Sequence, residues 1–152
     1  MEIKVTSTAF RDGAAIPVKY TCDSAGVSPP LSWSGVPVGV KSIALVCEDP
    51  DAPRGTFVHW VLFNLPAAVS NLPENVPIKK TLANGAVQGT NDVGRIGYLG
   101  PCPPGGVHRY IFKVYALDTM LDLQSGAASN DLDDAMESHI LAEGRLMGRY
   151  SR

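Results

Sequence analysis

The sequence lacks long apolar runs and any cluster of basic residues. Its longest uninterrupted apolar run, Ile43–Cys47, is far shorter than the roughly 18 residues that a membrane-spanning helix needs. The 13 Lys and Arg residues are scattered and are outnumbered by 15 Asp and Glu residues, which gives a formal net charge of −2. Nucleic-acid-binding domains usually carry a concentrated basic surface. We therefore expect a soluble protein that has no transmembrane segment and binds no nucleic acid.

Cysteine is also scarce. The chain has only Cys22, Cys47 and Cys102, an odd number that cannot all pair within one chain, and it has no Cys-x-x-Cys motif for zinc or redox chemistry. The N-terminal residues alternate between apolar and polar, whereas a signal peptide has a basic end and a continuous apolar stretch. These features predict a cytoplasmic protein in a reducing environment, with no metal and no cofactor.

Most of the chain has the pattern of β-strands. A length of 152 residues with 45% apolar content predicts one domain, residues 1–152, and the many Gly and Pro residues predict frequent turns. Alternation around Ile3 and Val5 predicts an outer strand, and the apolar run within 41–48 predicts a central strand that is covered on both faces. Further strands are predicted at 57–65 and 107–117, with shorter ones at 19–21, 31–33, 86–90 and 147–150. This number of strands is typical of a β-sandwich.

One segment, residues 130–143, has the pattern of a helix instead. Its apolar stripe is formed by Leu132, Met136, His139 and Ile140. Ser129 or Asn130 could cap the start, three aspartates suit the positive end of the helix dipole, and Gly144 could end the helix in the left-handed conformation. We expect one C-terminal helix over 130–143, with His139 partly buried on its apolar stripe.

Three stiff loops, each joined to a strand, contain the residues that are best suited to binding or catalysis. They are Asp49-Pro-Asp-Ala-Pro53, Gly55-Thr-Phe-Val-His-Trp60 and Gly100-Pro-Cys-Pro-Pro-Gly-Gly-Val-His-Arg-Tyr110. Proline fixes φ and restricts the residue before it, so such loops can hold side chains accurately. The third segment contains three X-Pro bonds, and we expect at least one of them to be cis.

Strand alternation places His108 and Tyr110 on one face of their strand, and it places His59 on the same face as Val61 and Phe63. A single histidine on an apolar face is more often a core residue with a satisfied hydrogen bond than a ligand contact. Here two histidines lie at the loop ends of long strands, and Asp49 also lies at a strand end. This arrangement favours a shared binding site.

At several other positions a purely structural role competes with a role in the binding site. Asp51 could bond the amides of its own turn or pair with Arg109. Trp60, expected opposite His59, fits a core position better than a cation-binding one. Cys102 could be a small hydrophobic residue or a redox-sensitive thiol. These alternatives stay open in the sequence.

Together the three segments resemble the phosphatidylethanolamine-binding protein family, also called the Raf-kinase-inhibitor-like family, in its short bacterial and archaeal branch. The resemblance covers essentially the whole chain. It implies a two-sheet antiparallel β-sandwich with Greek-key connections and a non-catalytic anion pocket, in a protein that is often a homodimer. The ligand-binding residues that it implies are Asp49, Ala52, Pro53, His59, Gly100, Pro101, His108 and Tyr110, with Asp51, Arg109 and Cys102 in secondary positions.

The chemistry of these residues supports an anion site without the family name. A carboxylate such as Asp49 beside an imidazole favours the charged ring, which can donate to a phosphate oxygen. A zwitterionic head group such as phosphoethanolamine would offer an ammonium to the aspartate and a phosphate to the histidines. The primary hypothesis is therefore binding of a phosphorylated small molecule or phospholipid head group, with a protein partner such as a kinase as a further expectation. Two alternatives are a metal- or His/Asp-dependent hydrolase that uses the same residues and a protease or kinase inhibitor that acts through surface loops.

Overall fold

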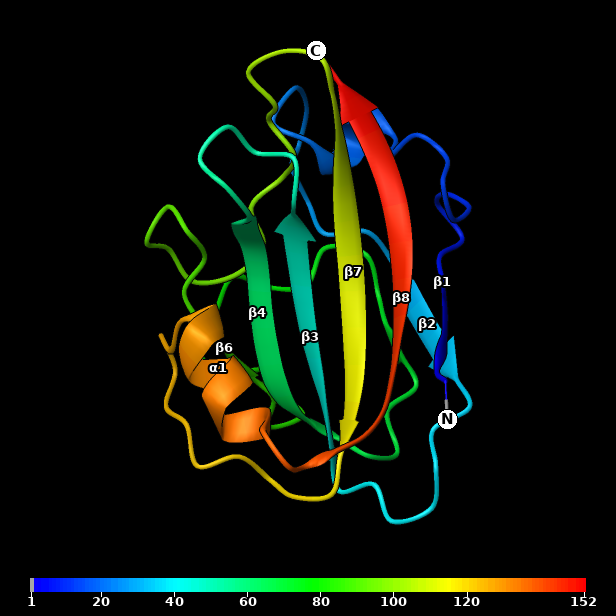
Figure 1. The fold of residues 1–152 in the computed structure, drawn as a ribbon, viewed down its shortest axis with the longest axis vertical. Helices are drawn as coiled ribbons and strands as arrows, with labels where there is room; N and C mark the ends of the chain where they lie inside the picture. Colours follow the sequence, from blue (N-terminus) through cyan, green and yellow to red (C-terminus); the bar gives the residue numbers. More distant parts are fainter. Residues whose placement is uncertain (1) are drawn as a thin grey trace.

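The computed structural model describes residues 2–152 as two antiparallel sheets and one α-helix (Figure 1). One sheet has the strand order β1-β2-β5 and the other has the order β6-β4-β3-β7-β8. The elements are β1 (Lys4–Thr6), the 3₁₀ helix η1 (Val18–Tyr20), β2 (Leu31–Ser34), β3 (Ser42–Asp49), β4 (Phe57–Pro66), β5 (Asn71–Leu72), β6 (Val87–Gln88), β7 (Val107–Leu117), α1 (Ser129–Met136) and β8 (Ile140–Ser151). Side chains of both sheets share one core cluster, which includes Val5 and Trp33 from the smaller sheet and Leu45 and Phe112 from the larger. The predicted two-sheet antiparallel sandwich is confirmed.

Strand β3 lies in the middle of the larger sheet, between β4 and β7. Its residues Ile43, Leu45 and Cys47 pack in the core between the sheets, whereas Ala44 and Val46 belong to a second cluster that contains Leu132 and Met136 of α1. In Figure 1, α1 lies beside the β4 side of this sheet. A strand that is buried on both faces needs a continuous apolar run, so the predicted central position of this segment is confirmed.

The helix is shorter than the sequence pattern predicts. Helix α1 ends at Met136, and Ser138 turns the chain with a φ of 68° before β8 begins at Ile140. Strand β8 then pairs with β7 along its whole length, from Leu117↔Ile140 to Val107↔Ser151. The prediction of helix for 137–143 is wrong because this long-range pairing outweighs the local spacing of apolar residues. His139 therefore lies in the turn, where its Nδ1 bonds Asp118 Oδ1 at 2.7 Å, rather than on a helix.

Two smaller local predictions are also wrong. Residues 18–20 form the 3₁₀ helix η1 rather than a strand, because Pro17 sets its entry and the Thr21 hydroxyl donates to the Val18 carbonyl at 2.9 Å. No peptide bond among residues 2–152 is cis, so the expected cis bond in the third loop is absent there. In the same part of the chain, no helix has the length and apolar character needed to span a membrane.

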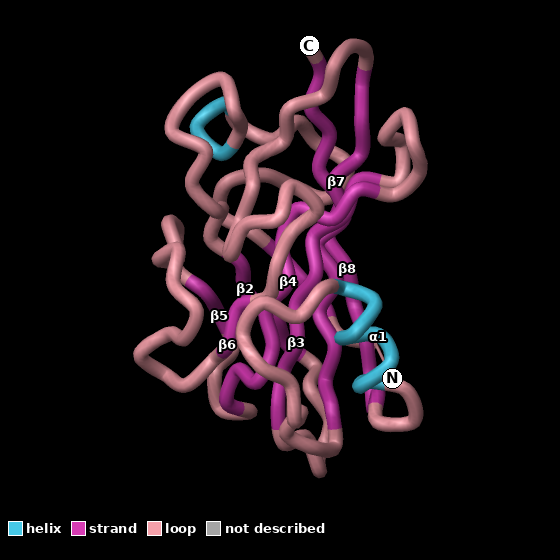
Figure 2. The backbone as a smooth tube through the Cα atoms, turned by 90° about the vertical axis from the view of Figure 1, so that its left-hand side faces the viewer, coloured by secondary structure: helices cyan, strands magenta, loops and turns pink. Residues whose placement is uncertain are grey.

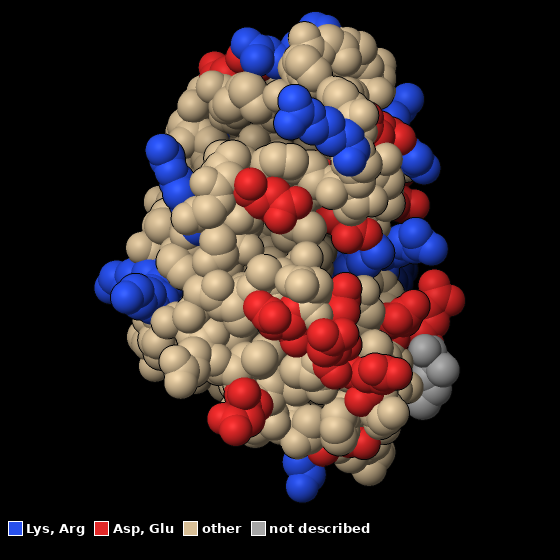
Figure 3. Space-filling view, turned by 60° about the vertical axis from the view of Figure 1, so that its left-hand side comes forward, with Lys and Arg blue, Asp and Glu red and all other residues tan. Residues whose placement is uncertain are grey.

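The charged surface agrees with the scattered charges of the sequence. Figure 3 shows one face on which the Lys and Arg side chains are separated from one another, while several Asp and Glu side chains gather in its lower half. This face carries no continuous basic patch, and such a patch is what sequence-independent binding of nucleic acid requires.

Gly144 lies within β8, where the N-terminal segment crosses the edge of the larger sheet. The Ile3 amide donates to the Glu143 carbonyl at 3.0 Å, and a Cβ at position 144 would lie 1.8 Å from the Ile3 carbonyl oxygen. The glycine is needed for this close approach and not, as predicted, for ending a helix. Tube and ribbon views show the N-terminal segment beside β8 (Figures 1 and 2).

We expect Gly144→Ala to lower the free energy of unfolding by about 3 kcal/mol, because the methyl group must push two backbone segments apart. Urea denaturation would measure this loss. The matched control is Gly105→Ala, since a Cβ there would meet no atom within 4 Å, and its effect should stay within about 0.5 kcal/mol. Equal stability of both variants would contradict the role assigned to Gly144.

Candidate functional site

The three stiff loops meet at one end of the larger sheet. Strand β3 is antiparallel to both β4 and β7, so its C-terminal end at Asp49 lies beside the starts of β4 and β7. These strand ends lie near the top of Figure 1. The sheet topology therefore brings the first two loops beside the third, so that Asp49 and His108 meet although they are 59 residues apart along the chain.

A cavity of about 280 Å³ lies between these loops. It is lined by Asp49, Ala52, Pro53, Phe57, His59, Val93, Leu99, Cys102, Pro103, Pro104, His108 and Tyr110. Six of the eight ligand-binding residues that the family resemblance implies are in this set. The other two, Gly100 and Pro101, are buried beside the wall and do not line the cavity.

A β-bulge directs His59 into the cavity. Cys47 pairs with Trp60 and Glu48 pairs with Val58, so His59 is the extra residue between these pairs. A bulge changes the direction in which the following side chains point. The prediction that His59 shares a face with Val61 and Phe63 is therefore wrong, because those two residues pack on the α1 side while the His59 ring contacts Tyr110, with centroids 5.2 Å apart.

His59 is held by a backbone carbonyl. Its Nδ1 lies 2.8 Å from the Leu99 carbonyl oxygen, which can only accept, so Nδ1 carries the proton. The side chain is buried, and loss of solvation lowers its pKa below the ordinary value, although the Leu99 hydrogen bond and the charges of Asp49 and Asp92 act in the opposite direction. The free protein therefore presents a neutral ring at neutral pH. Within residues 2–152 its Nε2 has no hydrogen-bond partner.

His108 is held by a carboxylate. Its Nδ1 lies 2.6 Å from Asp49 Oδ2, and the other Asp49 oxygen accepts the Asp51 amide at 2.8 Å. Asp49 is only 3% exposed, so both of its oxygens are committed within the protein. Asp49 thus orients the His108 ring and leaves its Nε2 toward the cavity, again with no partner in the described part of the chain.

Tyr110 lies between the two histidines. Its ring stacks on that of His108 with an interplanar angle of 21° and meets that of His59 edge-on. Burial raises the pKa of the phenol, and the negative charge of Asp49 adds to this effect, so the hydroxyl stays protonated. A side-chain hydrogen bond to Asp49 also contributes to the raised pKa, so the hydroxyl can donate to an anion in the cavity only by turning away from that carboxylate.

The secondary residues Asp51 and Arg109 form an ion pair outside the cavity lining. Arg109 donates Nε to Asp51 Oδ2 at 2.9 Å and Nη2 to Oδ1 at 2.8 Å, and its backbone amide also donates to Oδ2. These hydrogen bonds lower the pKa of Asp51 to about 2. The structure thus favours the structural alternative for this pair, which ties the first loop to β7.

Cys102 and Cys22 form a disulfide, with their Cα atoms 5.4 Å apart. The sequence interpretation of Cys102 as a small hydrophobic residue or free thiol is wrong, since an odd number of cysteines still permits one pair. The inference of a reducing environment loses its basis for the same reason. Cys47 remains free in the core, where burial raises its pKa.

Trp60 is fully buried, as expected for a core residue. It packs in the cluster between the sheets, edge-on against Tyr98, and its Nε1 donates to Gln88 Oε1 at 2.8 Å. The expectation that Trp60 faces away from His59 is wrong, because the bulge at His59 leaves both side chains on the inner side of the sheet.

Sequence reasoning missed part of the cavity lining, namely Phe57, Val93, Leu99, Pro103 and Pro104. Pro103 and Pro104 stand next to the predicted Pro101, so the third loop itself was the signal for them. Phe57 adjoins His59 two residues away, with ring centroids 5.0 Å apart. Val93 and Leu99 come from a separate loop, and no local pattern marks them.

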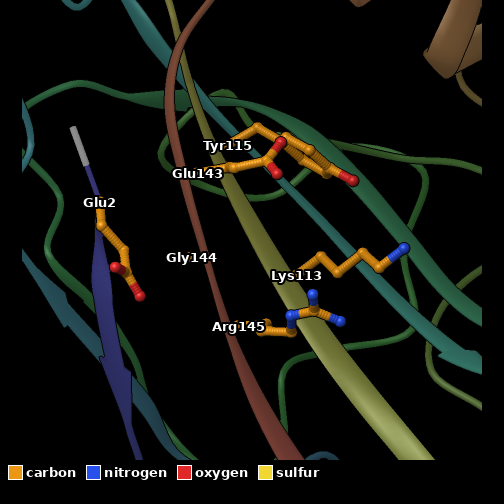
Figure 4. Close-up of a pocket in the computed structure, with 6 residues that line it drawn as sticks. All are labelled: Glu2, Lys113, Tyr115, Glu143, Gly144 and Arg145. Carbon is orange, nitrogen blue, oxygen red and sulfur yellow. The ribbon is translucent and has the colours of Figure 1, made fainter.

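A second cavity, of about 320 Å³, lies over β7 and β8 on the face opposite the smaller sheet. Figure 4 shows that Lys113 and Arg145 extend in the same direction, while the Glu143 carboxylate lies beside Tyr115. Lys113 is already paired with Glu48. Charges of both signs line this surface and none of the three stiff loops contributes to it, so it is a weaker candidate for an anion than the histidine cavity.

The fold is a two-sheet β-sandwich with a cavity at one end of its larger sheet. A family model described as phosphatidylethanolamine-binding protein matches residues 6–151. The chain belongs to this phosphatidylethanolamine-binding protein family, as the three motifs indicated.

Relatives and solved structures agree with this assignment. A UPF0098 protein of Methanothermobacter thermautotrophicus is 56% identical over 144 residues, which are 95% of each chain. One from Pyrococcus horikoshii is 47% identical over all of this chain and 78% of its own. A crystal structure described as a phosphatidylethanolamine-binding protein homolog of Chlamydia trachomatis matches with a TM-score of 0.91 and 46% identity, over 99% of this chain and 98% of that one. The structure of Escherichia coli YbcL, described as a member of the mammalian family, matches with a TM-score of 0.92 and 35% identity, over 100% and 99% of the two chains.

Proposed function

We propose that the histidine cavity binds one phosphoryl group, of a phosphorylated small molecule or a phospholipid head group, without catalysing a reaction. The observation that carries this proposal is the pair of Nε2 atoms of His59 and His108. Each ring is fixed through Nδ1, and among residues 2–152 neither Nε2 has a hydrogen-bond partner; both rings line the same cavity, on either side of Tyr110. A ring that donates through Nδ1 must gain a proton at Nε2 before it can donate to an anion; with that proton the two imidazoles can supply two hydrogen bonds to a tetrahedral anion, and the Tyr110 hydroxyl can add a third by turning away from Asp49.

The rest of the cavity favours an ester over a bare ion. Ala52, Pro53, Phe57, Pro103 and Pro104 supply apolar contacts around the polar floor. Asp49 is only 3% exposed, and its oxygens already accept from His108 and the Asp51 amide, so it offers little accessible surface to an ammonium group. Affinity should therefore depend on the phosphoryl group, with a smaller contribution from a head-group amine than the sequence suggested.

We expect inorganic phosphate and phosphoethanolamine each to shift the imidazole resonances of His59 and His108 in a saturable way, while His139 stays unchanged. Heteronuclear NMR of the side chains would show this. To distinguish a free phosphate ester from a lipid source, the protein would also be sedimented with vesicles that contain phosphatidylethanolamine. Binding of the two soluble probes without sedimentation on vesicles assigns the site to small molecules. Unshifted His59 and His108 with both soluble probes, together with no sedimentation on vesicles, would refute the proposal.

A hydrolase is the second candidate, because the Asp49–His108 hydrogen bond resembles the orienter and base of an acid/base site. In that case His108 Nε2 would take a proton from water during ester cleavage. Release of phosphate from phosphoethanolamine that depends on His108 would favour the hydrolase over the binding protein.

The remaining expectations concern partners. Modulation of a kinase, inhibition of a protease or kinase through surface loops, a homodimer and a cytoplasmic location stay predictions.

A further inference from the structure

One wall of the cavity is the segment from Tyr98 to Gly105, and its first half is held by hydrogen bonds. The Leu99 amide donates to the His59 carbonyl at 2.9 Å, and the Leu99 carbonyl accepts His59 Nδ1. On the other side, the Tyr98 hydroxyl donates to the Tyr20 carbonyl at 2.7 Å, and the Cys22 amide donates to the Pro101 carbonyl at 3.1 Å. The wall is therefore anchored up to Pro101 without any covalent bond.

The second half, residues 102–105, which we call the proline wall, is held differently. In the described chain these four residues make no backbone hydrogen bond, and two of them are prolines without an amide proton. The next backbone anchor is the reciprocal pair between Gly106 and Arg152, at 3.1 and 3.2 Å. Pro103 and Pro104 nevertheless line the cavity. The disulfide between Cys22 and Cys102 is the strongest attachment of the proline wall to the rest of the protein.

We propose that the Cys22–Cys102 disulfide positions the proline wall and makes the affinity of the anion site depend on the redox state of the protein. This inference rests on the proposed function and deepens it. Reduction releases residues 102–105, while the Leu99 anchor keeps His59 in place. The reduced protein thus retains the polar floor of the site and loses the fixed apolar wall above it.

The disulfide is accessible to exchange with a dithiol. Both cysteine residues are exposed, and the Arg152 guanidinium lies 3.3 Å from Cys102 Sγ, where it would stabilise the thiolate formed on reduction. A dithiol thiolate attacks Cys22 Sγ, the S–S bond breaks, and its electron pair leaves on Cys102 Sγ. The second dithiol thiolate then closes the reductant into a cyclic disulfide and releases Cys22. Two electrons pass from the dithiol to the protein, which gains two thiols.

The test compares phosphoethanolamine binding by the wild-type protein with and without dithiothreitol, and by the double variant Cys22→Ser/Cys102→Ser. Reduction should raise the Kd for phosphoethanolamine on the order of fivefold, because the wall that contacts the ester must be ordered on binding. The double variant should show the raised Kd in both conditions. Cys47 is buried and does not take part. On reduction, amide order parameters of Cys102 and Gly105 should fall below about 0.6, while the Nδ1-protonated tautomer of His59 persists.

An unchanged Kd after complete reduction would overturn the inference and leave the proposed function intact. General loss of amide protection in β3 would also overturn it, because the disulfide would then stabilise the whole fold rather than the wall. Absence of phosphoethanolamine binding in the oxidised protein would refute the proposed function itself. The three failures are distinguishable in one set of samples.

Discussion

His108→Ala should weaken phosphate binding on the order of 100-fold, and His59→Ala should do the same. Each substitution removes one charge-assisted hydrogen bond to the anion, an interaction worth about 1.5–3 kcal/mol. His108→Ala also leaves the carboxylate of Asp49 without its partner at 2.6 Å, and that buried negative charge would then repel the ligand. The loss can be measured by isothermal titration calorimetry with inorganic phosphate or by the chemical shifts of the remaining histidine.

The third histidine supplies the matched control. His139 is bonded to Asp118 in the turn before β8, at the opposite end of β7 from His108, and its side chain is 44% exposed. His139→Ala should therefore leave the Kd unchanged. If all three variants bind phosphate equally well, the anion lies elsewhere, and the cavity beside Lys113 and Arg145 becomes the leading candidate.

The parts of the fold that depend on local pattern were predictable from the sequence. The run Ile43–Cys47 indicated a doubly covered central strand, and the stiff loops before His59 and His108 indicated a site at one sheet end. The convergence of these histidines on Asp49 followed because antiparallel neighbours bring the end of one strand beside the starts of the next.

The parts that failed depend on contacts distant in the sequence. The helical spacing that continues to His139 and Ile140 gave no sign that Ile140 would begin a strand that pairs with β7. The bulge at His59 arises from the register between β3 and β4, so alternation within one strand could not reveal it. The acceptor for His59 is a backbone carbonyl 40 residues away, and the disulfide joins residues 80 positions apart. None of these leaves a periodic signal.

Anion binding should tighten as the pH falls, by up to about tenfold per pH unit. In the free protein, burial lowers the pKa of His59, and its single proton is donated to Leu99. Nε2 therefore presents a lone pair to the cavity, and an anion without a proton can bind there only if the ring gains one. Binding raises the pKa of His59, so the affinity is full below the pKa of the free ring and is lost as the pH rises through the pKa of the bound ring.

Sulfate is the best probe of this coupling between anion binding and His59 protonation, because it stays a dianion over the whole pH range of the measurement. A phosphate monoester can bring its own proton, since its second pKa lies near about 6, and this would mask the contribution of the ring. Calorimetry in two buffers of different ionisation enthalpy should show that sulfate binding at His59 takes up as much as about one proton near pH 7. His59→Gln keeps an amide N–H donor but cannot titrate, so this proton uptake should disappear. Sulfate affinity that is constant from pH 5.5 to 8 would mean that Nε2 of His59 does not face the anion, and the arrangement of donors proposed for this cavity would then be wrong.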